Sequence, residues 1–125
     1  MPYLIVFLGA GIGGALRHGV NVASSRLFGL GFPFGTLIVN IAGSFLMGLL
    51  AGYFAFRPGV DQHMRLFLTT GILGGFTTFS AFSLDTMLLI ERNRYALAAG
   101  YAAGSVAFSV AALFIGLALF RGAAS

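Results

Sequence analysis

Polar and aromatic side chains gather in one otherwise apolar stretch of the chain, Gly71–Ser83 (GILGGFTTFSAFS). Several of these side chains carry hydroxyl groups that can donate hydrogen bonds, among them Thr77, Thr78 and Ser80. Phe79 and Phe82 stand three residues apart, and the edge of a phenylalanine ring is the positive part of its quadrupole. The same spacing is also typical of simple helix packing. Donors and ring edges without fixed negative charge suit a small anion, so this stretch is a candidate anion site.

Two further groups of polar side chains interrupt apolar segments. Asn40 carries an amide that needs hydrogen-bond partners in hydrocarbon, either as a clamp between helices or as a donor to a passing anion. Tyr101, Ser105 and Ser109 are four residues apart and therefore share one face of a helix. Serine hydroxyls in helices also bond to their own backbone carbonyls, so the face is either an ion-lining track or a set of satisfied hydroxyls.

The polar inventory excludes several classes of function. The chain has no cysteine and no lysine, which removes thiolate metal sites and the lysine-containing phosphate loop of nucleotide-driven pumps. Its basic residues are scattered and not clustered, which argues against a nucleic-acid partner, while the net charge of +4 favours anions. The carboxylates, Asp61, Asp85 and Glu91, form neither a catalytic pair nor a metal cluster, so no enzyme is expected.

The elements that must position these residues are membrane helices. Of the 125 residues, 58% are hydrophobic and 8% charged, against about 25% charged in a soluble domain. Since about 20 apolar residues cross a bilayer, the chain predicts one all-α domain of four transmembrane helices. Their approximate ranges are 3–22, 34–56, 66–90 and 96–120. The first is read as a helix and not as a cleaved signal, and the third should be broken near 74–78.

The arginines give no preferred orientation in the membrane. With a cytoplasmic N-terminus, that side holds Arg57, Arg65 and Arg121, and the opposite side holds Arg26, Arg92 and Arg94. Because orientation follows the excess of basic residues in short loops, three against three favours neither. We therefore expect insertion in both orientations and an antiparallel homodimer. A fixed orientation set by a weak hydropathy gradient is the alternative.

Three blocks of the sequence resemble the Fluc-type fluoride channels, the CrcB family. They are GIGGALR (Gly11–Arg17), GTLIVNIAGSFLMG (Gly35–Gly48) and TGILGGFTTFSAFS (Thr70–Ser83). The resemblance implies a passive, fluoride-selective channel in the cell membrane that exports fluoride from the cytoplasm and relieves its toxicity. It also implies a dual-topology homodimer in membrane lipid, with two pores that both subunits line.

The resemblance also assigns roles to individual residues. The expected fluoride pathway consists of Arg17, Asn40, Thr78, Phe79, Ser80, Phe82, Tyr101, Ser105 and Ser109. Arg17 is expected near a pore vestibule, and the backbone carbonyls of Gly74 and Thr77 are expected to hold a structural sodium ion shared by both subunits. Two positions depart from the family pattern: Ala81 replaces a threonine, and His18 replaces an aromatic residue.

Two other readings remain open from the sequence. A small dual-topology, proton-coupled exporter of the multidrug-resistance type has a similar size, but helices 1, 2 and 4 offer no carboxylate for proton coupling. A purely structural membrane partner would leave Asn40 and Phe82 without a functional role. The fluoride channel is the reading that uses the polar stretch, the hydroxyl track and the absence of an energy-coupling motif together.

Overall fold

Four helical segments make up the fold. A computed structural model describes residues 2–29, 32–55, 59 and 61–124 of the chain. Within them α1 is Pro2–Phe28, α2 is Phe34–Ala55 and α6 is Tyr95–Ala124. The third segment consists of α3 (Gln62–Leu66), a π-helical turn η1 (Phe67–Leu73), α4 (Gly74–Phe76) and α5 (Phe79–Glu91). Four helical spans are long and apolar enough to cross a membrane, which confirms the predicted all-α membrane fold.

The helix ends follow local backbone chemistry. Helix α1 continues to Phe28, beyond the predicted end at Val22, because no glycine or proline follows until Gly29, which has a φ of 78°. Asp61 caps α3 by accepting a hydrogen bond from the backbone N–H of His63 at 3.2 Å. Phe56 and Arg57, where the second helix was expected to end, lie outside the described residues.

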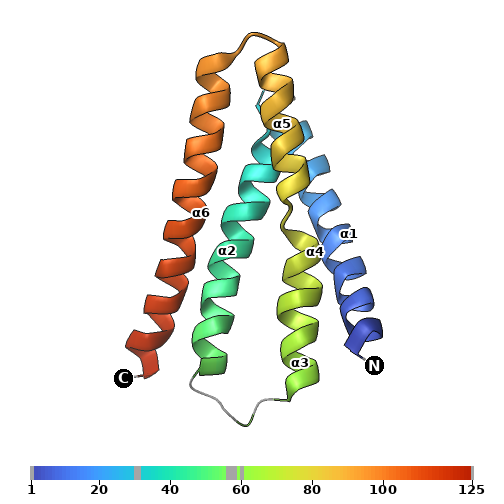
Figure 1. Cartoon of the computed structure of the whole chain (residues 1–125), viewed down its shortest axis with the longest axis vertical. Helices are drawn as coiled ribbons and strands as arrows, with labels where there is room; N and C mark the ends of the chain where they lie inside the picture. The colour runs from blue at the N-terminus through green and yellow to red at the C-terminus, as the bar shows by residue number, and fades with distance from the viewer. Residues whose placement is uncertain (1, 30–31, 56–58, 60, 125) are drawn as a thin grey trace.

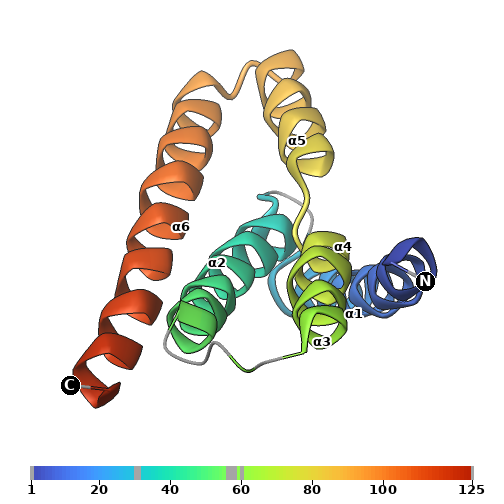
Figure 2. The same ribbon diagram turned by 60° about the horizontal axis from the view of Figure 1, so that its bottom comes forward.

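Helix α2 lies at the centre of the arrangement. Figure 2 shows α6 along one side of α2, and α3, α4 and α1 along the other. Glycines allow these helices to approach closely: a Cβ atom at Gly48 would collide with the backbone of α6, and one at Gly13 would collide with the backbone of the third segment. Gly11, Gly100 and Gly104 meet no other element of the chain.

The third segment is broken, as predicted. Thr77 (φ −83°, ψ 157°) and Thr78 (φ −153°, ψ 127°) are extended, so α4 stops and α5 starts again after them. Figure 1 shows this link as a short non-helical connection between α4 and α5, about halfway along the segment. The π-helical turn before the break was not predicted; Gly71 within it packs directly on Gly9 of α1. Interruptions of both kinds concentrate at functional sites in membrane proteins.

Candidate functional site

The side chain of Asn40 holds the break open. Its Nδ2 donates to the backbone carbonyl of Thr78 at 3.2 Å, and its Oδ1 accepts from the backbone N–H of the same residue at 3.0 Å. One amide thus replaces both backbone partners that an unbroken helix would have supplied. Of the two roles left open by the sequence, Asn40 performs that of the interhelical clamp. Its second Nδ2 hydrogen remains available as a donor.

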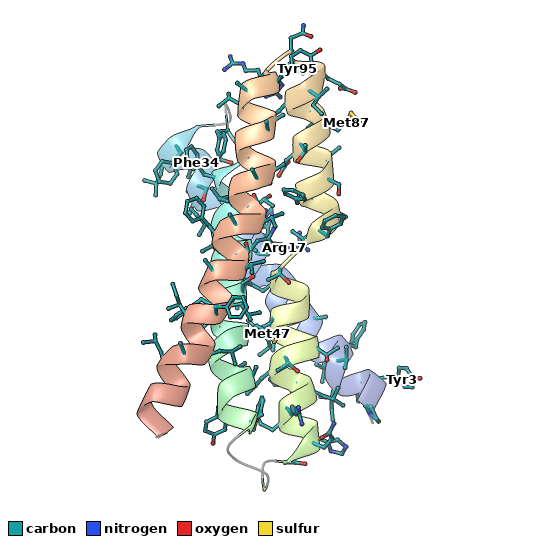
Figure 3. All side chains as sticks on the ribbon, turned by 60° about the vertical axis from the view of Figure 1, so that its left-hand side comes forward. Tyr3, Arg17, Phe34, Met47, Met87 and Tyr95 are labelled. Atoms are coloured by element: carbon teal, nitrogen blue, oxygen red, sulfur yellow. The ribbon has the colours of Figure 1, made fainter. Side chains whose placement is uncertain are left out.

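Arg17 supports the break from the opposite helix. Its Nε donates to the carbonyl of Gly75 at 3.2 Å, and Gly75 packs so closely on α1 that a Cβ atom there would overlap the backbone of Ala10. Figure 3 shows Arg17 at the level where α4 gives way to α5. Arg17 lines neither the cavity beside the break nor the one toward the far end of α5. Its observed contact is with a backbone carbonyl.

The carbonyls of Gly74 and Thr77 lose their usual helical donors at the break. In a continuous helix these donors would be the N–H groups of Thr78 and Ala81, four residues further on. The N–H of Thr78 is bonded to Asn40, and the N–H of Ala81 donates to Oγ1 of Thr78 at 3.2 Å. These two carbonyl oxygens carry partial negative charge without their usual helical donors, and hard cations prefer oxygen ligands of this kind.

A cavity of about 380 Å³ lies beside the break, between α2, α5 and α6. Seven residues singled out from the sequence line it: Asn40, Thr77, Thr78, Phe79, Phe82, Ser105 and Ser109. Four others do not line it, namely Arg17, Gly74, Ser80 and Tyr101. Ser80 is exposed with its Oγ 3.3 Å from Oγ1 of Thr78, and the ring of Tyr101 lies against that of Phe82.

Two hydroxyls in the wall of this cavity have no partner. Ser105 and Ser109 are bonded neither to their own helix nor to any other described residue, although their oxygen atoms are buried. A buried hydroxyl without a partner costs about 1–3 kcal/mol. These two groups are therefore available to whatever occupies the cavity, as the ion-lining alternative requires.

The backbone also gives the cavity a positive end. Thr78 and Phe79 stand at the N-terminus of α5, where the first N–H groups of a helix lack partners and carry partial positive charge. No charged side chain lines the cavity. Phe79 and Phe82 have ring centroids 5.6 Å apart in a tilted arrangement, and Phe79 is 77% exposed in the isolated chain. Helix N-termini and hydroxyl donors of this kind bind anions.

Asp85 adds a contact that was not predicted. Its Oδ2 accepts from Oγ1 of Thr36 at 2.8 Å and from the hydroxyl of Tyr101 at 3.3 Å. The ring of Tyr101 in turn lies 5.3 Å from that of Phe82. The signal was present in the sequence, since Asp85 follows Phe82 by three residues and so shares its helix face. The carboxylate of Asp85 thus links Tyr101, which packs on the aromatic wall of the cavity, to the first turn of α2.

Comparison with known proteins gives a consistent result. Residues 4–117 match the family described as CrcB-like protein, Camphor Resistance (CrcB). The chain is 60% identical over 121 residues to the "Fluoride-specific ion channel FluC" of Rhodopseudomonas palustris, covering 97% of this chain and 98% of that protein. It is 63% identical over 118 residues to the protein of the same name from Methylobacterium nodulans, covering 94% of each chain. The relative from Nitrobacter hamburgensis, "Fluoride-specific ion channel FluC 2", is 59% identical over 121 residues.

Proposed function

The chain belongs to the CrcB family, and we propose from this premise that it is a passive, fluoride-selective channel that exports fluoride from the cytoplasm. It is a multi-pass protein of the plasma membrane and not an enzyme. The observation that carries the proposal is the cavity beside the break. It combines the N-terminus of α5, two phenylalanines and two unpartnered serine hydroxyls, with no charged side chain among the described residues that line it.

The lining suits fluoride because it replaces water with fixed donors. A small, strongly hydrated anion crosses a membrane only where the protein supplies hydrogen bonds in place of its hydration shell. The second Nδ2 hydrogen of Asn40, the N-terminus of α5 and the hydroxyls of Ser105 and Ser109 surround one space. The ring edges of Phe79 and Phe82 add weak positive potential and narrow the path. Larger halides would need a wider lining.

Transport needs no energy-coupling machinery. With a negative cell interior, the membrane potential drives an anion outward with about 2.3 kcal/mol per charge for each 100 mV. The proton-coupled exporter is not favoured, because the relatives carry the name of a fluoride channel and the cavity has no titratable side chain in its wall. Asp85 lies outside this cavity and is held by two hydroxyls.

An antiparallel homodimer in the lipid bilayer is the proposed assembly. The accessible surface of the chain is 7658 Å², whereas a compact protein of this mass exposes roughly 6,300 Å². Phe79 at the edge of the cavity is largely exposed, and Gly100 and Gly104 on α6 meet no other described element of the chain. Small residues in such positions let a second helix approach closely. These features support a second copy that completes the wall of each cavity.

A sodium ion between the two copies fits the free carbonyls at the break. Gly74 and Thr77 would hold it through their backbone oxygens, because their helical donors are bound by Asn40 and Thr78. The ion would supply positive charge to these oxygens and connect the subunits, without taking part in transport. Arg17 already satisfies the neighbouring carbonyl of Gly75 and so leaves two carbonyls per chain for the cation.

Fluoride efflux from liposomes containing the purified protein tests the proposed function. We expect fluoride to leave down its gradient once a potassium ionophore balances the charge, while chloride stays inside. No fluoride flux, or equal flux of chloride, would refute the channel. Replacing sodium with a large organic cation during purification should lower the dimeric fraction, and an unchanged dimer would refute the structural ion alone.

A further inference from the structure

A second cavity of about 250 Å³ lies toward the far end of α5 from the break. Residues of three elements enclose it: the last turns of α1, the first turn of α2 and the outer half of α5. At about 30 Å³ per water molecule, it has room for about eight waters or for one hydrated ion. We refer to it as the mouth cavity.

The mouth cavity contains polar groups that lack partners. Ser24 is only 6% exposed, and its hydroxyl makes no hydrogen bond to a described residue. The amide of Asn21, one turn earlier on α1, is also unpaired within the described chain and packs against Gly35 at the start of α2. The hydroxyl of Ser24 and the amide of Asn21 are therefore available to whatever occupies the cavity.

The distribution of donors and acceptors favours an anion. Arg92 is among the residues that line the cavity, and its guanidinium group carries five N–H donors. The backbone N–H groups of Gly35 and Thr36 stand in the first turn of α2, where a helix carries partial positive charge. Asp85 is the one carboxylate among the lining residues, and its Oδ2 already accepts two hydrogen bonds. The donors of Arg92 and of the first turn of α2 are therefore available to an anion.

The two cavities are connected through a short chain of contacts. Asp85 lines the mouth cavity and is bonded to the hydroxyl of Tyr101. The ring of Tyr101 lies against Phe82, which lines the cavity beside the break. The contacting side chains of Asp85, Tyr101 and Phe82 therefore connect the walls of the two cavities.

We propose that the mouth cavity is a binding site for a small inorganic anion, with Arg92 supplying the charge and Ser24 and Asn21 supplying neutral donors. Its role as the mouth of a transport pathway rests on the proposed fluoride channel, but its ability to bind an anion does not. Because a hydrated ion fits the space, the site accepts chloride as well as fluoride, and selectivity arises further along, at the cavity beside the break.

The line width of the chloride-35 NMR signal measures binding directly. Purified protein in phosphatidylcholine nanodiscs should broaden the line, and added fluoride should reverse the broadening by competition. Arg92→Gln and Ser24→Ala should each weaken chloride binding about fivefold, as expected for the loss of one charge-assisted or buried hydrogen bond. Arg94→Gln and Ser83→Ala are matched controls on exposed residues that do not line either cavity, and they should leave binding unchanged.

Asp85→Asn provides a test of opposite sign. If the site binds an anion, removing this carboxylate should tighten chloride binding. If the site binds a cation, the substitution should leave chloride binding unchanged or weaken it. Equal line widths for Arg92→Gln and Arg94→Gln would overturn the proposal. If the protein no longer broadens the chloride line in phosphatidylglycerol nanodiscs, the site binds lipid headgroups. This outcome would also overturn the proposal.

The two proposals fail separately. A protein without fluoride efflux whose chloride broadening still depends on Arg92 and Ser24 would retain the anion site and refute the channel. If fluoride efflux is normal but the chloride line broadening does not change on substitution of Arg92 or Ser24, the channel proposal stands and the mouth site is refuted.

Discussion

The break in the third segment and the serine face of α6 border the same cavity but treat their polar groups in opposite ways. At the break, the side chains of Asn40 and Arg17 and the hydroxyl of Thr78 each bond to a backbone group. On α6, Ser105 and Ser109 are buried and bond to nothing in the described chain. Unsatisfied polar groups in a membrane are costly, and the polar side chains at the break satisfy backbone groups that would otherwise lack partners. Their presence is therefore explained by the fold alone.

The second set has no such explanation within one chain. A serine in a helix can bond to a carbonyl one turn earlier, as Thr69, Thr77 and Thr86 all do in the third segment. Ser105 and Ser109 do not make this local hydrogen bond. We therefore propose that the satisfied polar groups maintain the architecture of the site and that the unsatisfied ones contact the transported ion. The following substitutions test that division, beginning with the largest expected change in stability.

Asn40→Leu should be the most damaging substitution. It leaves the N–H and the carbonyl of Thr78 without partners, at about 1–3 kcal/mol for each group. We expect the free energy of unfolding in detergent to fall by about 2–6 kcal/mol and fluoride efflux to disappear. Asn40→Asp, which keeps the acceptor for the N–H but loses the donor, should be intermediate. Ser44→Ala, on the same helix and cavity without a hydrogen bond, is the stability control. Wild-type stability for Asn40→Leu would show that Asn40 is no clamp.

Arg17→Gln should come next. Loss of a charged donor to the carbonyl of Gly75 should lower the free energy of unfolding by about 1.5–3 kcal/mol, and Arg17→Lys should recover part of it. Efflux should fall together with the amount of folded protein, while the fluoride concentration for half-maximal flux stays constant. Arg26→Gln, on an exposed residue of the same helix, is the control. If the fluoride concentration for half-maximal flux rises while stability stays normal, Arg17 acts on the ion pathway, which is the role that the family resemblance implies.

Gly75→Ala tests the close packing behind the break. The added methyl group would overlap the backbone of Ala10, and overpacking of this kind costs typically about 1–3 kcal/mol. We expect a lower thermal unfolding temperature in detergent and reduced efflux. Gly11→Ala, on α1 at a position that meets no other element, should be neutral or slightly stabilising. Equal effects of the two substitutions would mean that α1 does not pack on the break as described.

The sequence predicted more of the architecture than of the contacts. Four apolar spans and a break among glycines and threonines follow from local composition, and both are confirmed. The partners of Asn40 and Arg17 lie 38 and 58 residues away, so local spacing could not distinguish a clamp from an ion contact. The π-helical turn includes Gly71, which packs on Gly9 of α1, and a contact between two segments is not visible in local spacing. Pathway roles for the individual residues stay predictions.

Ser105→Ala and Ser109→Ala should show the smallest change in stability and the clearest separation from function. Removing a buried hydroxyl that has no partner leaves no group unsatisfied, so the free energy of unfolding should stay constant or rise by up to about 1 kcal/mol. Fluoride efflux should nevertheless fall about tenfold for each substitution, the loss of one hydrogen bond to the ion in a dry site. Fluoride-electrode traces and thermal unfolding of the same preparations measure both quantities. Lower stability with unchanged efflux would reverse the division between the two regions, because the serines would then belong to the architecture.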